Sequence, residues 1–245
     1  MLLVGSVYLD HARSEKWYRL QTEFLKKTTF NFHHVVYVNG TNNFYDKSLV
    51  LNIDKRPAKS VQDSHIRGLN SIISYFNSNL DYDSLLLLDS DCFPIHGNWQ
   101  QRLDDKINPF NVAAVARYEN LDTFAHPCAF YAKRAASKNL YFSDVSQTNI
   151  IGSNFTDTAS NITKFFPLIR SNIRNYHPVL FGVYWNIFYH HGAGSRDLSF
   201  RLFYHYFNND TNVAQLEQES FDKLVNSPIE FLSNINKVYL NLKMN

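Results

Sequence analysis

Two carboxylates follow directly on an unbroken apolar run in this sequence of 245 residues. The run, Ser84 to Leu88, leads straight into Asp89-Ser90-Asp91. Apolar residues that do not alternate with polar ones are typical of a strand covered on both faces. Two carboxylates at positions i and i+2 after such a strand can converge on one divalent cation, which would complete its shell with substrate phosphates. The alternative is an acidic turn that closes the strand.

A second set of candidate ligands occurs later, in the stretch His190-His191-Gly192-Ala193-Gly194-Ser195-Arg196. His191 begins the pattern His-x-x-Gly, and an imidazole suits manganese as a third protein ligand. The glycines, Gly194 among them, would let the backbone approach a pyrophosphate closely, and Arg196 could pair with phosphate oxygens. The alternative is a glycine-rich turn after two structural histidines.

Together, the two motifs resemble the GT-A glycosyltransferases. In that family an Asp-x-Asp motif holds a metal, often manganese, that binds the diphosphate of a nucleotide-sugar donor, and many members add a metal-binding histidine near the end of the catalytic domain. The resemblance implies Asp89, Asp91 and His191 as metal ligands and Mn²⁺ or Mg²⁺ as the cofactor. It places Asp91 nearest the metal, with Asp89 bound through water or to the donor ribose. His190 is the alternative to His191, because neighbours on a strand point to opposite faces.

The resemblance also suggests residues for the donor. The nucleotide would lie over the end of the first strand, near Tyr8, and the segment Ser64 to Asn70 looks like the helix before the metal strand in bacterial and viral polysaccharide-type transferases. The alternative for its polar residues is exposure to solvent or capping of neighbouring structure. Gly68 in this helix costs about 1 kcal/mol relative to alanine, so a packing or ligand reason is expected. The donor-binding candidates are Tyr8, His65, Arg67, Asp89, Ser90, Gly194 and Arg196.

Asp157, in Thr156-Asp157-Thr158-Ala159, is the candidate carboxylate on the acceptor side. An inverting transferase needs a base that takes the proton of the acceptor hydroxyl. The alternative is an aspartate that caps a helix. His126-Pro127 and Trp185 are candidates for lining the acceptor pocket, and core packing explains them equally well.

Composition excludes several classes of protein. Hydrophobic residues make up 44% and aromatic residues 16%, which is enough to build a core, and a net charge of +2 without a basic cluster argues against nucleic acid as a partner. Cys92 and Cys128 form neither a disulfide framework nor a zinc motif, which favours a reducing compartment. Since no apolar run approaches the roughly 20 residues of a membrane span, we expect a cytoplasmic protein, with peripheral membrane attachment as an alternative.

The pattern of elements predicts a single α/β domain with a mixed, mostly parallel sheet flanked by helices. In such sheets ligands bind beyond the carboxyl ends of the strands, where Asp89 and Asp91 fall. We expect a nucleotide-binding half over 1–95, an acceptor half over 96–210 and a C-terminal helical segment over 211–245. The predicted strands are Leu2–Tyr8, Phe32–Val38, Ser48–Ile53, Ser84–Leu88, Val112–Ala116 and Ala129–Ala132, with one extended stretch over His177–Tyr189; the predicted helices begin at Ser14, Ser60 and Ser227, the last running to Tyr239.

These features predict transfer of a sugar from a nucleotide-diphosphate sugar, UDP-sugars being favoured, to a glycan or another hydroxyl acceptor. A sugar-phosphate nucleotidyltransferase is the first alternative. Such enzymes usually carry a glycine-rich phosphate loop after the first strand, and Tyr8 to Arg13 lacks the glycines. The second alternative is a non-catalytic nucleotide-sugar binder on the same fold.

Overall fold

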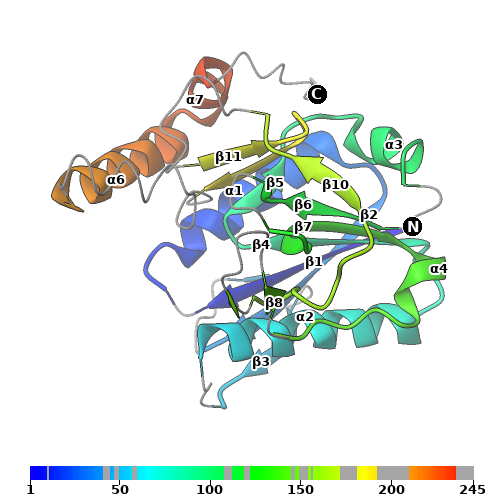
Figure 1. Ribbon diagram of the computed structural model, residues 1–245. Helices are drawn as coiled ribbons and strands as arrows, with labels where there is room; N and C mark the ends of the chain where they lie inside the picture. Colours follow the sequence, from blue (N-terminus) through cyan, green and yellow to red (C-terminus); the bar gives the residue numbers. More distant parts are fainter. Residues whose placement is uncertain are drawn as a thin grey trace.

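A seven-stranded sheet forms the centre of the protein in the computed structural model (Figure 1). Its strand order is β10-β6-β7-β4-β1-β2-β3. The strands are β1 (Leu2–Leu9), β2 (Phe32–Asn39), β3 (Val50–Asp54), β4 (Ser84–Asp89), β6 (Val112–Ala116), β7 (His126–Lys133) and β10 (Phe166–Ile169). The structure describes residues 1–9, 11–40, 45–46, 50–56, 60–107, 112–118, 122–144, 147–148, 154–155, 157–171, 181–191 and 210–235.

The sheet is mixed and mostly parallel, as predicted. β1 pairs in parallel with β2 and β4, β2 with β3, and β10 with β6, whereas β7 runs antiparallel between β4 and β6. The ends of β1, β4 and β6 therefore meet at one edge, and β7 brings its first residues to that same edge. A second sheet has the order β11-β12-β5, formed by β11 (Phe181–Tyr184), β12 (Phe188–His191) and β5 (Cys92–Pro94).

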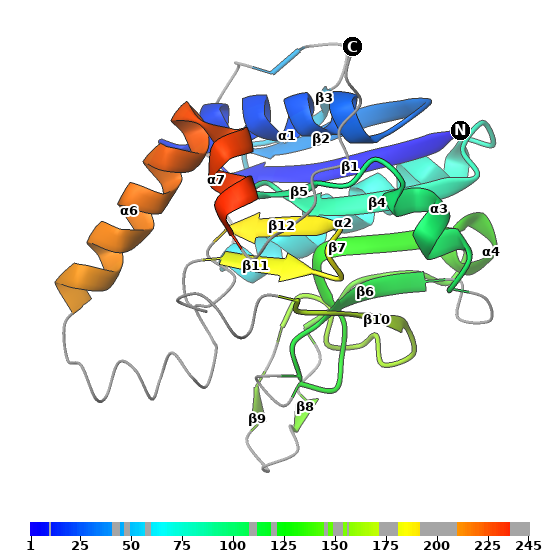
Figure 2. The same cartoon turned by 90° about the horizontal axis from the view of Figure 1, so that it is seen from above.

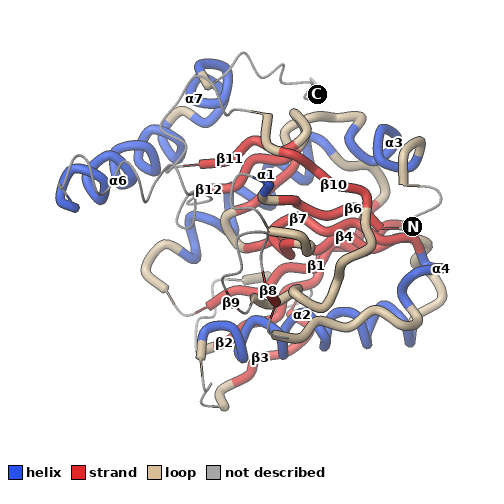
Figure 3. Tube along the Cα trace, in the orientation of Figure 1, coloured by secondary structure: helices blue, strands red, loops and turns tan. Residues whose placement is uncertain are grey.

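Alternate side chains of the central strands pack against different layers. Leu85 and Leu87 face α2 (Val61–Ser78), whereas Leu86 and Leu88 face the second sheet and α3 (Trp99–Asp104). Because both faces are covered, the apolar run of β4 has no alternation, which is why the sequence predicted a buried strand. Figure 3 shows this arrangement, with the strands gathered in the centre and the helices on the outside.

Helix starts were predicted with mixed success. The side chain of Ser60 accepts a hydrogen bond from the Asp63 backbone N–H, as the capping pattern predicted for α2. α1 (Ser14–Thr28) begins at the predicted residue, but Ser14 does not cap it: Arg13 is at the cap position, and the Ser14 hydroxyl donates to the Leu9 carbonyl. Ser227 precedes α7 (Pro228–Asn234) without a side-chain capping bond.

The C-terminal half departs further from the prediction. The extended stretch expected over His177–Tyr189 is a hairpin where it is described, because Trp185 and Asn186 take positive φ values of 51° and 55° and turn the chain between β11 and β12. α7 ends at Asn234 and not at Tyr239, since Ile235 is extended. It follows α6 (Asp210–Asn226), and both lie beside the second sheet (Figure 2). A short helix, α4 (Arg134–Ser137), follows β7. Two short strands, β8 (Gln147–Thr148) and β9 (Asn154–Phe155), come after it in the chain.

Among the described residues, no helix combines the length and the apolar character that a membrane span requires.

Gly68 is required where α2 packs on the sheet. A Cβ at this position would lie 2.6 Å from Val7 Cγ2 and 3.0 Å from Tyr37 Cδ1. The expected reason for a glycine within the helix is therefore packing.

We expect Gly68→Ala to lower the free energy of unfolding by about 1–3 kcal/mol, the usual cost of overpacking, although alanine favours the helix by about 1 kcal/mol. Urea denaturation measures the change. Ser74→Ala, at an exposed position of the same helix, is the matched control and should be neutral or slightly stabilising. A Gly68→Ala variant as stable as the wild type would contradict the packing argument.

Candidate metal and ligand site

The turn that carries the two carboxylates is held by a buried glutamine. Gln21 of α1 donates from Nε2 to the backbone oxygens of Asp89, at 2.9 Å, and Cys92, at 2.6 Å. Its Oε1 accepts from the hydroxyls of Ser6, at 2.7 Å, and Tyr8, at 2.8 Å. All polar atoms of this amide are thus used, and the turn between β4 and β5 has a fixed position. No motif predicted this role for Gln21; the available signal was a polar residue beside Leu20 on the apolar face of the helix.

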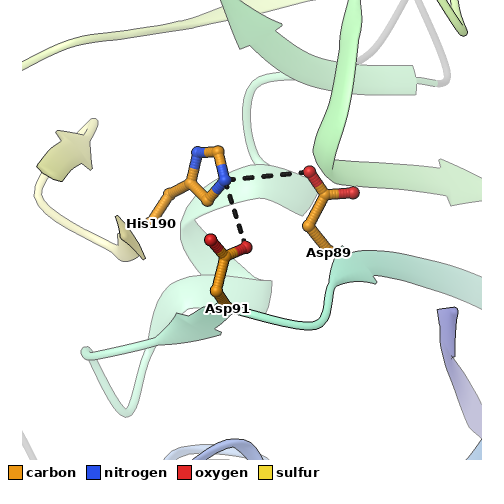
Figure 4. A group of neighbouring side chains, drawn as sticks. All are labelled: Asp89, Asp91 and His190. Atoms are coloured by element: carbon orange, nitrogen blue, oxygen red, sulfur yellow. Dashed lines mark ion pairs between the residues drawn. The ribbon is translucent and has the colours of Figure 1, made fainter. Parts of the chain in front are cut away.

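His190 completes a cluster of three possible ligands. β12 pairs antiparallel with β5 and sets His190 opposite Cys92. The Nε2 atom of His190 then lies 3.3 Å from Asp91 Oδ1 and 3.7 Å from Asp89 Oδ2. Figure 4 shows the imidazole directed at both carboxylates. One ligand atom from each of the three residues lies within 4.8 Å of the others.

This cluster fits a divalent cation. Two carboxylates and an imidazole form a donor set suited to manganese and related ions. Asp89 Oδ1 is buried and accepts no hydrogen bond from the described residues; its near neighbour is His65 Nε2, an ionic contact at 3.2 Å. A buried carboxylate oxygen with a single polar contact can accept more, and a bound cation would satisfy it.

The charges of the cluster shift its protonation equilibria. Burial alone would lower the pKa of His190, but the nearby carboxylate of Asp91 and the thiol of Cys128 together outweigh it, and the pKa rises to about 10. Burial would raise the pKa of Asp89, but His65 and His190 lower it overall. These shifts favour a proton on His190 and a negative charge on Asp89. A metal must displace that proton when it binds.

His191 lines the same cavity, but its side chain is not among the ligand atoms that converge with Asp89 and Asp91. Its Nε2 is 3.0 Å from Glu217 Oε1, its Nδ1 is 3.0 Å from the Tyr189 hydroxyl, and its ring packs 5.0 Å from that of Trp17. The preference for His191 over His190 is therefore corrected: the structure brings the alternative, His190, to Asp89 and Asp91. Alternation along a strand allows one of the two neighbours to face the carboxylates, and the pairing with β5 selects which.

Glu217 connects this strand to the C-terminal helices. It accepts from both terminal nitrogens of Arg13, at 2.6 and 3.0 Å, as well as facing His191. These hydrogen bonds, that of His191 first, lower the pKa of Glu217 to about 2 despite its partial burial. α6 is thereby joined to both α1 and β12.

A cavity of about 580 Å³ opens over the strand ends that carry this cluster. Of the predicted donor residues, it is lined by His65, Asp89 and Ser90. Tyr8 does not line it: this side chain is fully buried and bonded to Gln21. Arg67 also turns elsewhere, since it pairs with Asp54 at 3.0 Å and Asp63 at 3.5 Å. Gly194 and Arg196 lie outside the described residues.

The cavity wall also contains a chain of buried ionisable groups. His126 lies between two aspartates, with Nε2 2.9 Å from Asp122 Oδ2 and Nδ1 3.2 Å from Asp157 Oδ2. The other oxygen of Asp157 accepts from the Thr158 backbone N–H at 2.7 Å. Asp157 begins a turn here, not one of the described helices, and it lines the cavity together with His126 and Pro127.

The structure changes the assignment of two further residues to the cavity lining. Trp185 packs its ring on Phe166 and under the guanidinium of Arg102, and it is not part of the cavity lining. Arg117, which the sequence analysis did not select, does line the cavity. The sequence offered one indication of this role: Arg117 directly follows the predicted strand β6, just as Asp89 lies at the end of β4.

No family model matches the sequence, and no curated protein matches it. Among solved structures, the chain is similar to A197 from STIV, with 13% identity and a TM-score of 0.38, over 78% of this chain and 93% of that chain. It is similar to a glycosyltransferase involved in the glycosylation of the major capsid of PBCV-1, with 14% identity and a TM-score of 0.35. It is also similar to S. aureus TarS 1-349, with 12% identity and a TM-score of 0.39. These last two matches cover 56% and 58% of this chain, and 61% and 50% of the matched chains.

Proposed function

We propose that this protein transfers a glycosyl group from a nucleotide-diphosphate sugar to a hydroxyl acceptor, with Mn²⁺ or Mg²⁺ bound by Asp89, Asp91 and His190. The observation that carries the proposal is the convergence of these three side chains at the end of β4. The adjoining cavity of about 580 Å³ lies in the usual volume range for small-molecule sites. A strand end in a largely parallel sheet is also where ligands of such folds bind.

The chemistry explains why these residue types are needed. A bound cation neutralises the charge that builds on the leaving diphosphate. Asp89 and Asp91 supply hard oxygen ligands and His190 a nitrogen ligand, while Gln21 holds the turn that positions both carboxylates. His65, 3.2 Å from Asp89, orients that carboxylate at the cavity wall.

Asp157 is the proposed base for the acceptor. It lines the same cavity as the metal cluster, so an acceptor hydroxyl between them could pass its proton to this carboxylate. His126 and the backbone of Thr158 hold both oxygens of Asp157 in place, and Asp122 in turn holds His126. A base positioned in this way suits inversion at the anomeric carbon, which requires removal of the acceptor proton.

A thermal-shift screen tests the proposal. UDP-, GDP- and dTDP-sugars are each added with and without Mn²⁺, and we expect one nucleotide class to raise the Tm only when Mn²⁺ is present. Ligand at 100 times its Kd adds about 2.7 kcal/mol to the stability of the native state. Failure of every nucleotide sugar to shift the Tm would remove the donor assignment.

The acceptor side has its own control. Asp157→Asn should retain the Mn²⁺-dependent shift with the donor and lose transfer to a hydroxyl acceptor. If the wild type binds the donor but neither hydrolyses nor transfers it, the protein is a non-catalytic binder.

A further inference from the structure

Arg117 is a buried cation that lines the cavity, and its side chain has no hydrogen bond or ion pair with the described residues. It follows directly on β6, is 8% exposed and lines the cavity beside Asp157 and Cys128. Its Nε atom has no hydrogen-bond partner in the described part of the chain. Within the same part, no carboxylate oxygen comes close enough to form an ion pair with its guanidinium.

Other arginines of the chain show how different this is. Arg13 forms two bonds with Glu217, and Arg67 pairs with Asp54. Arg134 donates to the backbone oxygens of Phe76 and Asn79. Each of these guanidiniums has a carboxylate or carbonyl partner, although the Nε atom of Arg67 also lacks a hydrogen bond. No described residue supplies such a partner for Arg117.

A buried guanidinium without a partner carries a large desolvation cost. It cannot escape this cost by losing its proton. Burial would lower the pKa of Arg117, but the nearby groups of Tyr184, Cys128, Asp157 and Asp89, in that order, favour the charged form and raise the pKa overall. The positive charge therefore persists at the cavity wall, and donors that no described residue engages are available to an anion that enters the cavity.

We propose that Arg117 forms an anion subsite that binds a phosphate or carboxylate group of the ligand filling this cavity. The planar guanidinium presents paired N–H donors that match two oxygens of either group. The identity of this ligand rests on the proposed function. If the protein is a glycosyltransferase, the anion has two possible sources. It is the diphosphate of the donor, or an acidic substituent such as the carboxylate of a uronic acid on one of the sugars.

Two simple probes distinguish the sources in calorimetric titrations. The first is inorganic pyrophosphate with Mn²⁺, and the second is glucuronate compared with glucose. We expect Arg117→Gln to weaken pyrophosphate binding at least tenfold if the subsite takes the diphosphate. If it takes a sugar carboxylate, the wild type should prefer glucuronate to glucose, and the variant should lose that preference. Arg102→Gln, remote from the cavity lining, is the matched control and should bind as the wild type does.

Arg117→Lys keeps the charge and removes the paired donors, so its affinity for the probe should lie between those of the wild type and Arg117→Gln. If Arg117→Gln does not fold, the affinity of Arg117→Lys tests the subsite in its place. The inference is wrong if the wild type binds neither probe, or if folded Arg117 variants bind both probes as the wild type does. Its failure is separable from failure of the proposed function. Mn²⁺-dependent hydrolysis of a nucleotide sugar by the wild type supports glycosyl transfer whichever way the probes bind.

Discussion

Asp91→Asn is expected to reduce Mn²⁺-dependent turnover of the nucleotide sugar at least about 100-fold, the scale of losing one well-placed electrostatic contact in a transition state. Asn keeps the size of the side chain but removes the negative charge that the cation needs. Asp91 Oδ1 is also the nearer of the two carboxylate contacts of His190, at 3.3 Å. One substitution therefore affects the whole cluster. Steady-state hydrolysis of the donor, titrated with Mn²⁺, measures the effect.

The fold should survive this substitution. Asp91 lies in a turn between two strands and its side chain is 27% exposed, so the free energy of unfolding should change by on the order of 1 kcal/mol. Asp81→Asn changes an exposed carboxylate outside the cavity and should leave turnover unaltered. Normal turnover by a folded Asp91→Asn variant, with an unchanged Mn²⁺ requirement, would rule out the metal assignment.

The strands and the acidic pair were accessible from the sequence because local patterns encode them. The uninterrupted apolar run of β4 predicts a strand covered on both faces, and the acidic pair at its end predicts a ligand position. The hairpin between β11 and β12 was not accessible, since Trp185 and Asn186 adopt positive φ without the glycine that usually marks such a turn. Tertiary contacts impose that backbone conformation.

The rest of the site depends on contacts between distant segments. Gln21 and Asp89 are far apart in the chain, and their contact arises only when α1 packs on the sheet. The link from Asp122 through His126 to Asp157 likewise needs a loop to fold back on β7. Arg117 carried a local signal, its place at a strand end. Its importance is visible only in the folded state, where it is buried at the cavity wall and no described residue pairs with its side chain.

The choice between two adjacent histidines gives the second large expected effect. His190→Ala should weaken Mn²⁺ affinity at least tenfold, because changes even in groups that merely support metal ligands cost 10- to 100-fold. His191→Ala should change Mn²⁺ affinity little. It should instead lower the free energy of unfolding by about 1.5–3 kcal/mol, the worth of a hydrogen bond to a charged group, because it removes the bond to Glu217. Calorimetric Mn²⁺ titration and urea denaturation of both variants give the two readouts.

These two variants control for each other, because they remove the same side chain from neighbouring positions of one strand. A general loss of folding would affect both titrations equally, whereas a ligand role affects one. The pairing of His190 with Cys92 directs position 190 toward Asp89 and Asp91, and the backbone bond from His191 N–H to the Asp91 oxygen, at 3.1 Å, keeps that register. If Mn²⁺ affinity falls with His191→Ala and not with His190→Ala, then His191 is the metal ligand and the opposite face of β12 is directed toward the cation. If neither variant changes it, no imidazole of this strand binds the metal.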